Sequence, residues 1–404
     1  MSRARPALVA VLLVVAGATA TLAVSGDVTA PVEPGDDPVV GTSENATRVL
    51  LLTEADAAAF NEPNTTVTNT LEAGHQQLSA DLRLKQVERR LETAGSEAQR
   101  RQVLVNATDW AERRLDELRA RERSARDRFA SGDITAAEYV LELGTIHSQA
   151  DELVRTIGAT GSEGTLYAFA GTLSDSSAVR PRLSRIRTQL VALEGPVRAR
   201  AAAVIHGERD SVRVHVTAGN GVMLSTIENG QYIRETYRED NLVDETADYG
   251  DVQALVQSYY PWVSNNTEGG SQFTLSGRYA TQYSVNHPYG SLVVWISAAS
   301  DRVYVERQEL TLEQFPATIE HTDSAGGTTL ATGRTYAGGP LLVRVENTTG
   351  APVDSTISLN GREVGATGDD GRLWVLSPAG EYNVTTTTET GATLEVNVTA
   401  RPAP

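Results

Sequence analysis

From about residue 45 to residue 206, apolar positions recur three and four residues apart, as they do on one face of an α-helix. Val67, Leu71, Leu78 and Leu82 form one such stripe, and a second runs over residues 103–129. Breaks at 95–96 and 131–133 separate successive segments, and acid-first ion pairs four residues apart cover the polar face of the second. The pattern predicts antiparallel helices, packed as a bundle or a long hairpin, over residues 45–206.

From about residue 207 the period of the apolar positions changes to two, which is typical of β-strands. Val212, Val214 and Val216 alternate with polar residues, and Gly219-Asn220-Gly221 and Glu228-Asn229-Gly230 predict tight hairpin turns. A short helix is expected over 251–260, and further strands over 272–278, 292–297 and 302–310. Residues 207–322 are therefore predicted to form an α+β domain with an antiparallel sheet.

The remaining residues divide into a Gly/Thr/Ala-rich stretch, 323–339, and a run of short strands with glycine turns, 340–400. We expect a linker in the first and a small β-sandwich in the second. The predicted fold class is thus multidomain α + β, with an N-terminal helical bundle or hairpin, a central α+β domain and a C-terminal β-sandwich.

Three motifs in the C-terminal part resemble one known module. Gly350-Ala351-Pro352-Val353, Gly368-Asp369-Asp370-Gly371 and Pro378-Ala379-Gly380-Glu381-Tyr382-Asn383-Val384 resemble the opening, the turn and the closing strand of carboxypeptidase-regulatory-like, or transthyretin-like, β-sandwich modules. The resemblance implies a spacer or adhesion unit of an exported protein, without catalysis of its own. The whole layout also resembles haloarchaeal exported proteins, a resemblance that supplies no activity.

The first residues have the layout of an export signal. Arg3 and Arg5 precede an uncharged run over residues 7–24, which contains small-x-small cleavage candidates. We predict a signal peptide or an N-terminal anchor over residues 1–25, and the run is at the lower limit of length for a membrane span. Residues 26–44, which are rich in proline, are expected to form a flexible linker. The predicted location is extracytoplasmic, either secreted or anchored to the outer face of the membrane.

Charge and composition narrow the classes of partner. The chain carries 35 basic and 52 acidic residues, a net charge of −17, and Lys85 is its single lysine. Such a surface is typical of a halophilic protein and cannot neutralise phosphates, which argues against nucleic acid and anionic lipid as partners. The absence of cysteine excludes disulfides, thiolate metal sites and cysteine nucleophiles.

No catalytic signature is found in the sequence. It has no phosphate-binding loop, no complete dinucleotide-binding glycine set, no H-E-x-x-H and no G-x-S-x-G. The six histidines lack metal-ligand spacing, and a triad of distant Ser, His and Asp residues stays open. We therefore predict no enzyme activity and no cofactor. One acidic run could supply calcium ligands, although a solvated loop explains it better: Glu239, Asp240, Asp244, Glu245, Asp248 and Asp251.

Two further sets of residues are candidates for surface chemistry. An aromatic cluster could bind a sugar or a protein, with core packing as the alternative: Tyr259, Tyr260, Trp262, Tyr279, Tyr283 and Trp295. Seven Asn-x-Ser/Thr sequons are candidates for N-glycosylation: Asn45, Asn64, Asn106, Asn265, Asn347, Asn383 and Asn397.

The leading functional hypothesis is a non-enzymatic protein of the cell envelope with a structural, binding or adhesion role. Its partner would be an envelope protein or a glycan, and its contact with the membrane would be limited to residues 7–24 if these are not cleaved. One alternative is a membrane-anchored extracellular sensory or accessory subunit. Another is an exported hydrolase, for which a pocket holding His215 or His287 beside a carboxylate and a serine would be evidence. The oligomeric state is not predicted.

Overall fold

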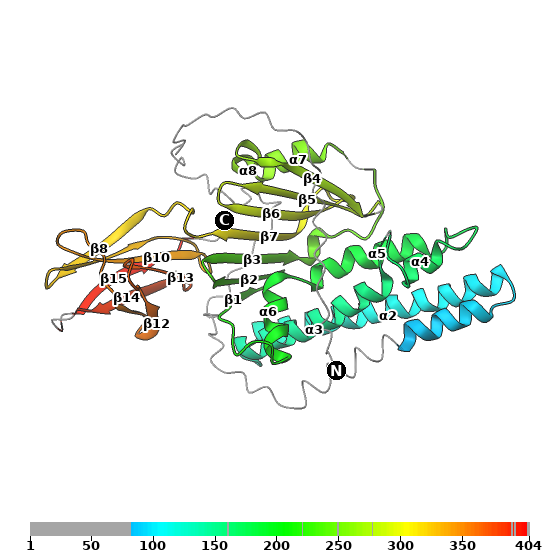
Figure 1. The fold of residues 1–404 in the computed structure, drawn as a ribbon, viewed down its shortest axis with the longest axis horizontal. Coiled ribbons are helices and arrows are strands. Elements are labelled where there is room, and N and C mark those ends of the chain that lie inside the picture. Colours follow the sequence, from blue (N-terminus) through cyan, green and yellow to red (C-terminus); the bar gives the residue numbers. More distant parts are fainter. Residues whose placement is uncertain are drawn as a thin grey trace, which may run out of the picture. The chain divides into compact units, whose positions relative to one another are not determined.

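The structure is a computed structural model that describes residues 82–159, 161–219, 221–248, 250–276, 278–388, 391 and 393–401 (Figure 1). All of these residues fall in one of the two compact units of the chain, Asp37–Pro404. The predicted export segment, the linker over 26–44, and the sequons Asn45 and Asn64 lie outside the described residues. No helix among the described residues has the length and the apolar character needed to cross a bilayer.

The N-terminal half of the described chain is helical, as its pattern predicts. A helical segment over residues 82–93 is followed by α2 (Glu97–Ala130), α3 (Ala136–Ile157), α4 (Leu166–Ala170), α5 (Arg180–Leu190), the 3₁₀ turn η1 (Val191–Leu193) and α6 (Pro196–Ile205). The Ser96 side chain caps α2 by accepting a hydrogen bond from the Gln99 N–H. Thr135 and Glu138 form a capping box at the start of α3.

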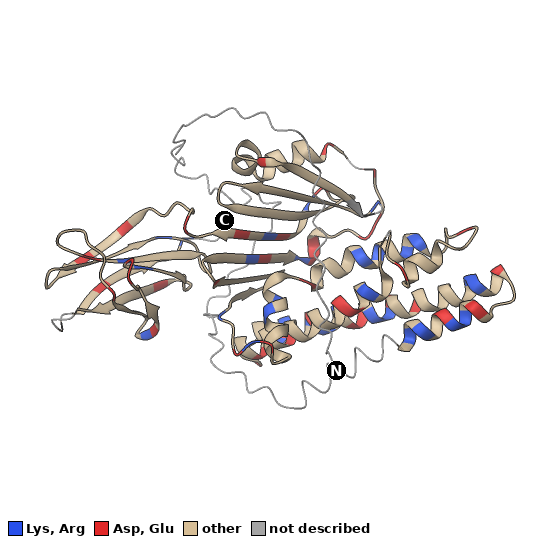
Figure 2. Cartoon of the chain, in the orientation of Figure 1, with Lys and Arg blue, Asp and Glu red and all other residues tan. Residues whose placement is uncertain are grey.

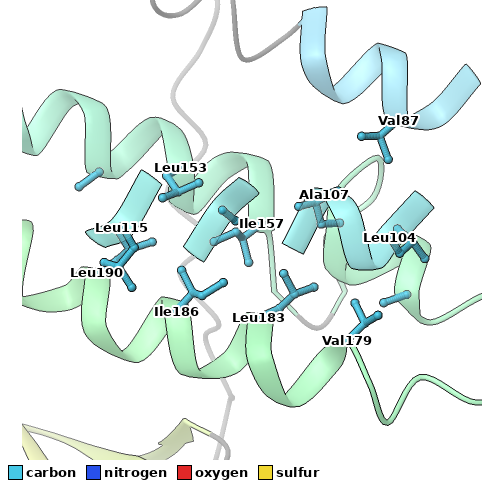
Figure 3. Packing of buried hydrophobic residues seen from close by; sticks show 14 of the residues in the cluster. Val87, Leu104, Ala107, Leu115, Leu153, Ile157, Val179, Leu183, Ile186 and Leu190 are labelled. Carbon is cyan, nitrogen blue, oxygen red and sulfur yellow. The ribbon is translucent and has the colours of Figure 1, made fainter. Parts of the chain in front are cut away.

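The helices α2, α3 and α5 share one hydrophobic core. Figure 3 shows Leu115 together with Leu153 and Ile157, and Ile186 and Leu190 on α5 point toward them. These side chains come from the apolar stripes at three- and four-residue spacing, so the stripes are what hold the bundle together. At Gly144 the helices α3 and α6 approach so closely that a Cβ atom there would lie 2.8 Å from the Ala202 backbone nitrogen.

A seven-stranded antiparallel sheet follows, with the order β1-β2-β3-β7-β6-β5-β4. Its strands are β1 (His215–Ala218), β2 (Gly221–Glu228), β3 (Gln231–Arg238), β4 (Glu268–Ser276), β5 (Ala280–His287), β6 (Gly290–Ser297) and β7 (Val303–Thr311). Between β3 and β4 lie η2 (Glu239–Asn241), α7 (Val252–Tyr259) and α8 (Pro261–Asn265). The predicted Asn-Gly turn joins β2 to β3, with Asn229 at φ 51° and Gly230 at φ 74°.

Helices cover both faces of this sheet. On one face, Val197 and Val204 of α6 pack in the same cluster as Leu224 and Ile233. On the other face, α7 and α8 lie over β5 and β6. Side chains that alternate along a central strand are therefore buried on both sides, which is unusual for an antiparallel sheet.

The C-terminal part is a sandwich of two four-stranded sheets, with orders β13-β10-β9-β8 and β12-β11-β14-β15. The strands are β8 (Ile319–Ala325), β9 (Thr328–Gly333), β10 (Pro340–Asn347), β11 (Thr356–Leu359), β12 (Arg362–Ala366), β13 (Arg372–Leu376), β14 (Glu381–Thr387) and β15 (Thr393–Thr399). Leu341 and Val343 from one sheet share a core with Ile357 and Val384 from the other. The multidomain α + β prediction is thus confirmed.

The predicted linker over residues 323–339 is wrong. Its first part forms the β8–β9 hairpin, and Gly326 and Gly327 turn the chain at φ 60° and 82°. Leu330 is fully buried in the sandwich core. The composition of this stretch suggested a flexible segment, but its glycine pair forms a hairpin turn.

Candidate functional sites

Four of the six aromatic residues proposed as a binding surface are buried, whereas Trp262 and Tyr279 are partly exposed. Tyr259, Tyr260, Tyr283 and Trp295 are between 1% and 7% exposed. The three tyrosines belong to the core under α7 and α8, whereas Trp295 lies in a separate core cluster. Our surface prediction was wrong for these residues because it assumed that one face of the sheet is open to solvent.

Trp262 belongs to a different arrangement, which we call the aromatic row: Trp262, Tyr289, Phe315 and Trp374. Trp262 stacks on Tyr289 with ring centroids 5.2 Å apart and an interplanar angle of 14°. Tyr289 meets Phe315 edge-on at 5.9 Å, and Phe315 meets Trp374 at 6.3 Å. All four side chains are partly exposed. Little in the sequence points to this row, because its members lie up to 112 positions apart (374 − 262).

The aromatic row links the central sheet to the sandwich, since Trp374 lies on β13 and Tyr289 joins β5 to β6. Leu310, Leu312 and Leu376 pack in the same cluster. The loop between β9 and β10 adds hydrogen bonds to the central sheet: Ser225 Oγ donates to the Gly338 carbonyl at 2.7 Å, and the Tyr336 and Tyr232 hydroxyls lie 3.1 Å apart. We call this set of contacts the joint.

The centre of the sheet holds buried ion pairs, visible as charged positions on β3 and β7 in Figure 2. On the face under α7 and α8, Arg234 pairs with Glu306, and both side chains are less than 5% exposed. The Tyr260 hydroxyl also donates to Glu306, at 2.5 Å. On the other face, Arg198 of α6 lies 3.3 Å from Glu235. Burial raises the pKa of Glu235, and the Arg198 guanidinium opposes that shift.

Most carboxylates of the acidic run considered for calcium binding form ion pairs with arginines. Three guanidiniums of α2, those of Arg119, Arg123 and Arg126, lie within 3.2 Å of Glu239. Further along the run, Asp240, Asp244 and Asp248 each pair with an arginine, and Asp251 caps α7. Within the described residues no group of three or more His, Asp or Glu side chains is placed to hold a metal ion.

A groove of about 480 Å³ lies along α3 and α6. Ser148 Oγ lies 3.0 Å from His206 Nε2 and 3.2 Å from the Gly144 carbonyl, to which it donates. The neighbouring carboxylates Glu142 and Asp151 pair with arginines that also line the groove. These polar groups therefore satisfy one another. The Ser148 hydroxyl thus has two hydrogen-bond partners, the Gly144 carbonyl and the His206 ring.

The two histidines named for the hydrolase alternative lie in packed surroundings. His215 is 1% exposed and bonds to Thr217 Oγ1 at 3.1 Å, and His287 is 2% exposed and contacts the Trp262 ring. Burial lowers the pKa of each imidazole to about 4. Neither residue lines the groove along α3 and α6, so this groove is not the pocket that the hydrolase hypothesis requires.

Comparison with protein families identifies the family to which the helical part belongs. Residues 1–210, more than half of the 404, match the model of a domain of unknown function, DUF7096. The chain belongs to the DUF7096 family. Residues 214–316 match a family of unknown function, DUF7094, and residues 319–395 match an archaeal fibronectin-III type-like domain. No curated protein matches the chain.

These matches follow the architecture closely. The DUF7096 match ends after α6, the DUF7094 match covers the central sheet, and the third match begins with β8. The last match supports a C-terminal β-sandwich. The matched fibronectin-III type-like domain is a different module from the carboxypeptidase-regulatory-like one that the motifs at 350–384 resemble.

Glu194, between η1 and α6 of the DUF7096 region, makes stability depend on pH. Burial raises the pKa of Glu194 from 4.5 to about 7, with Arg307 opposing the shift and Asp151 adding to it. Between pH 4.5 and about 7 the folded state thus holds a proton on Glu194 that the unfolded state releases. The stability that the protonated carboxyl contributes is complete below pH 4.5 and is lost as the pH rises through about 7. We expect Glu194→Gln to raise the melting temperature above pH 7 and to leave it unchanged below pH 4.5.

Thermal unfolding followed by circular dichroism at both pH values measures this effect. Glu208→Gln is the matched control, because Glu208 lines the groove nearby and is exposed. An equal effect of Glu194→Gln at both pH values would mean that ionisation of this carboxyl is not the cause.

The five described sequons differ in their surroundings. Asn106 lies within α2, and Asn265 is the exposed last residue of α8. Asn347 ends β10, and its Oδ1 accepts hydrogen bonds from the backbone and side chain of Thr349. Asn383 and Asn397 lie directly opposite each other on β14 and β15. Glycosylation at these positions stays a prediction.

Proposed function

We propose that this DUF7096 protein is an exported, non-enzymatic component of the cell envelope that works as one rigid structural and binding unit. The observation that carries the proposal is the joint. Tandem modules that move independently are connected by exposed polar linkers. Here the aromatic row and Leu376 of the sandwich pack on the central sheet, and Tyr336 and Gly338 are bonded to it.

The sandwich supports a spacer or adhesion role. Its motifs resemble carboxypeptidase-regulatory-like modules, and its sequence matches an archaeal fibronectin-III type-like domain. Both kinds of module are β-sandwiches, a fold that by itself implies no catalysis. A sandwich fixed at a constant angle would hold a surface at a defined distance from the rest of the protein.

Export and partner choice rest on the sequence. The uncharged run over residues 7–24 would direct the chain out of the cytoplasm and, if not cleaved, anchor it to the outer face of the membrane. A net charge of −17 suits an envelope protein or a neutral glycan as partner and disfavours nucleic acid and anionic lipid. Halophilic surroundings would explain the nearly complete replacement of lysine by arginine and the acidic surface.

Protease treatment of intact cells of the native host, followed by intact-mass measurement of the medium and the membranes, tests this proposal. We expect the protein to be digested from outside, or to be found in the medium without its first residues. A full-length chain held only in the membranes keeps the sensory-subunit alternative and makes a membrane partner the next one to crosslink. A full-length chain that is soluble inside the cell and protected from protease would contradict export.

A further inference from the structure

Two buried histidines lie at the joint. The His215 ring is 1% exposed and packs so closely under Gly338 of the β9–β10 loop that a Cβ atom there would lie 2.5 Å from its Cδ2. His287 is 2% exposed and meets the rings of Trp262 and Tyr289 edge-on, with centroids 5.5 and 6.5 Å apart. One histidine therefore touches each of the two sets of contacts, the loop and the aromatic row, that hold the sandwich on the central sheet.

The hydrogen bonds of His287 require a neutral ring. Its Nδ1 accepts a hydrogen bond from the Tyr289 backbone N–H at 3.3 Å, and a backbone N–H can only donate. A proton on Nδ1 would place two N–H groups against each other and remove this bond. Its Nε2 is buried without a hydrogen-bond partner among the described residues. Protonation of this ring therefore breaks a contact to a member of the aromatic row.

His215 is also placed to be neutral. Its Nε2 lies 3.1 Å from Thr217 Oγ1, and its Nδ1 is buried without a hydrogen-bond partner in the described part of the chain. Both nitrogens of an imidazolium donate, so one N–H of the charged ring would be left unpaired. A buried, unpaired charge is costly, whereas water would solvate it if the loop moved off the ring.

The charges around the two rings do not offset this cost. Four titratable or charged side chains lie on β2, β13 and the β9–β10 loop, which surround His215: Glu228, Arg334, Tyr336 and Arg372. Glu228 already pairs with two arginines, and Arg234, two strands away in the same cross-strand row, pairs with Glu306. Around His287, α8 and β6 carry no charged residue, and Glu268, the one charged residue of β4, is exposed to water.

We propose that the joint is a proton-operated hinge, which holds the sandwich on the central sheet while His215 and His287 are neutral and releases it when they are protonated. The inference rests on the proposed rigid joint and adds a condition under which that joint opens. Opening brings both rings into water, so the open form binds protons more tightly than the closed form.

The direction of the pH effect follows from the burial of the two rings. Burial lowers the pKa of each imidazole in the closed form to about 4, from the ordinary 6.5 that water restores in the open form. The stability of the closed form is therefore complete above pH 6.5 and is lost as the pH falls toward about 4. Histidine is the side chain best suited to such a switch.

Pulsed electron spin resonance on the full chain, with spin labels at the exposed positions Asp116→Cys on α2 and Asp369→Cys in the sandwich, measures the opening. The distance distribution should be narrow at about pH 7.5 and broad at about pH 5, because each histidine shifts the equilibrium toward the open form by roughly thirtyfold between them. The circular dichroism of the helices and strands should be unchanged at the lower pH, since the parts separate without unfolding.

The double variant His215→Gln/His287→Asn removes the titrating rings and keeps polar side chains in their places. The asparagine oxygen can still accept the Tyr289 N–H. Its distribution should stay narrow at both pH values, and each single variant should keep one of the two roughly thirtyfold steps. His206→Gln is the matched control, because His206 lies in the groove along α3 and α6 and should leave the opening unchanged.

The possible outcomes separate this inference from the proposed function. A distribution that stays narrow at the lower pH would overturn the hinge and leave the rigid joint standing. Broadening that is the same in both single variants as in the wild type would overturn the hinge too, as would a loss of circular dichroism at the lower pH. A distribution that is already broad at neutral pH would overturn the joint itself, and the hinge with it.

Discussion

Replacing Arg234 with methionine is expected to lower the free energy of unfolding by about 3–5 kcal/mol. Arg234 and Glu306 are both buried in the middle of the central sheet, with side chains 4% and 1% exposed. Methionine would fill much of the space but leave the Glu306 carboxylate buried without its main counter-charge. Tyr260 and Gln308, which also donate to Glu306, are neutral and replace only part of that interaction.

Urea unfolding followed by circular dichroism measures the change. Arg278→Met is the matched control, because Arg278 pairs with Asp248 at an exposed site where both side chains are more than 60% exposed. An exposed pair contributes less than about 1 kcal/mol. The double variant Arg234→Met/Glu306→Leu should recover part of the lost free energy of unfolding, since it also removes the buried Glu306 carboxylate. A loss below 1 kcal/mol for Arg234→Met alone would show that water reaches this pair.

Replacing Trp374 with alanine is expected to uncouple the sandwich from the central sheet. On β13 the neighbouring Val375 points into the sandwich core, whereas Trp374 contacts Phe315 outside that core. The substitution therefore removes the sandwich's contribution to the aromatic row and spares the fold of the sandwich itself. Truncating a large aromatic side chain at a packed site costs about 3 kcal/mol or more, and a partly exposed one costs less.

Differential scanning calorimetry should show the wild-type sandwich unfolding together with the central sheet, and two separate transitions in Trp374→Ala. Arg372→Ala is the control, because Arg372 lies on the same strand with the same side-chain direction and is exposed. If the wild type already shows a separate sandwich transition, the joint does not couple the two parts.

The sequence was most informative where local rules decide the structure. Ser96 as a helix cap, the Asn229-Gly230 turn and the change from helical to alternating periodicity all depend on residues close together in the chain. These features predicted the three parts of the fold and their order.

It was least informative where tertiary packing decides. Strand β3 has Arg234 and Glu235 on opposite faces, and alternation would place one of them in water, yet both are buried because helices cover both faces. The same covering buried Tyr260 and Trp295, which we had placed on a surface. The aromatic row depends on contacts between distant segments, which a single sequence does not contain.

The central claim, that the sandwich and the rest of the DUF7096 protein form one rigid unit, is tested most directly by a distance measurement. Because the chain has no cysteine, spin labels can be attached at Asp116→Cys on α2 and Asp369→Cys in the sandwich, both exposed positions. Pulsed electron spin resonance should give a single narrow distance distribution in the wild-type background and a broad one after Trp374→Ala. A distribution that is already broad in the wild-type background would show that the joint does not hold.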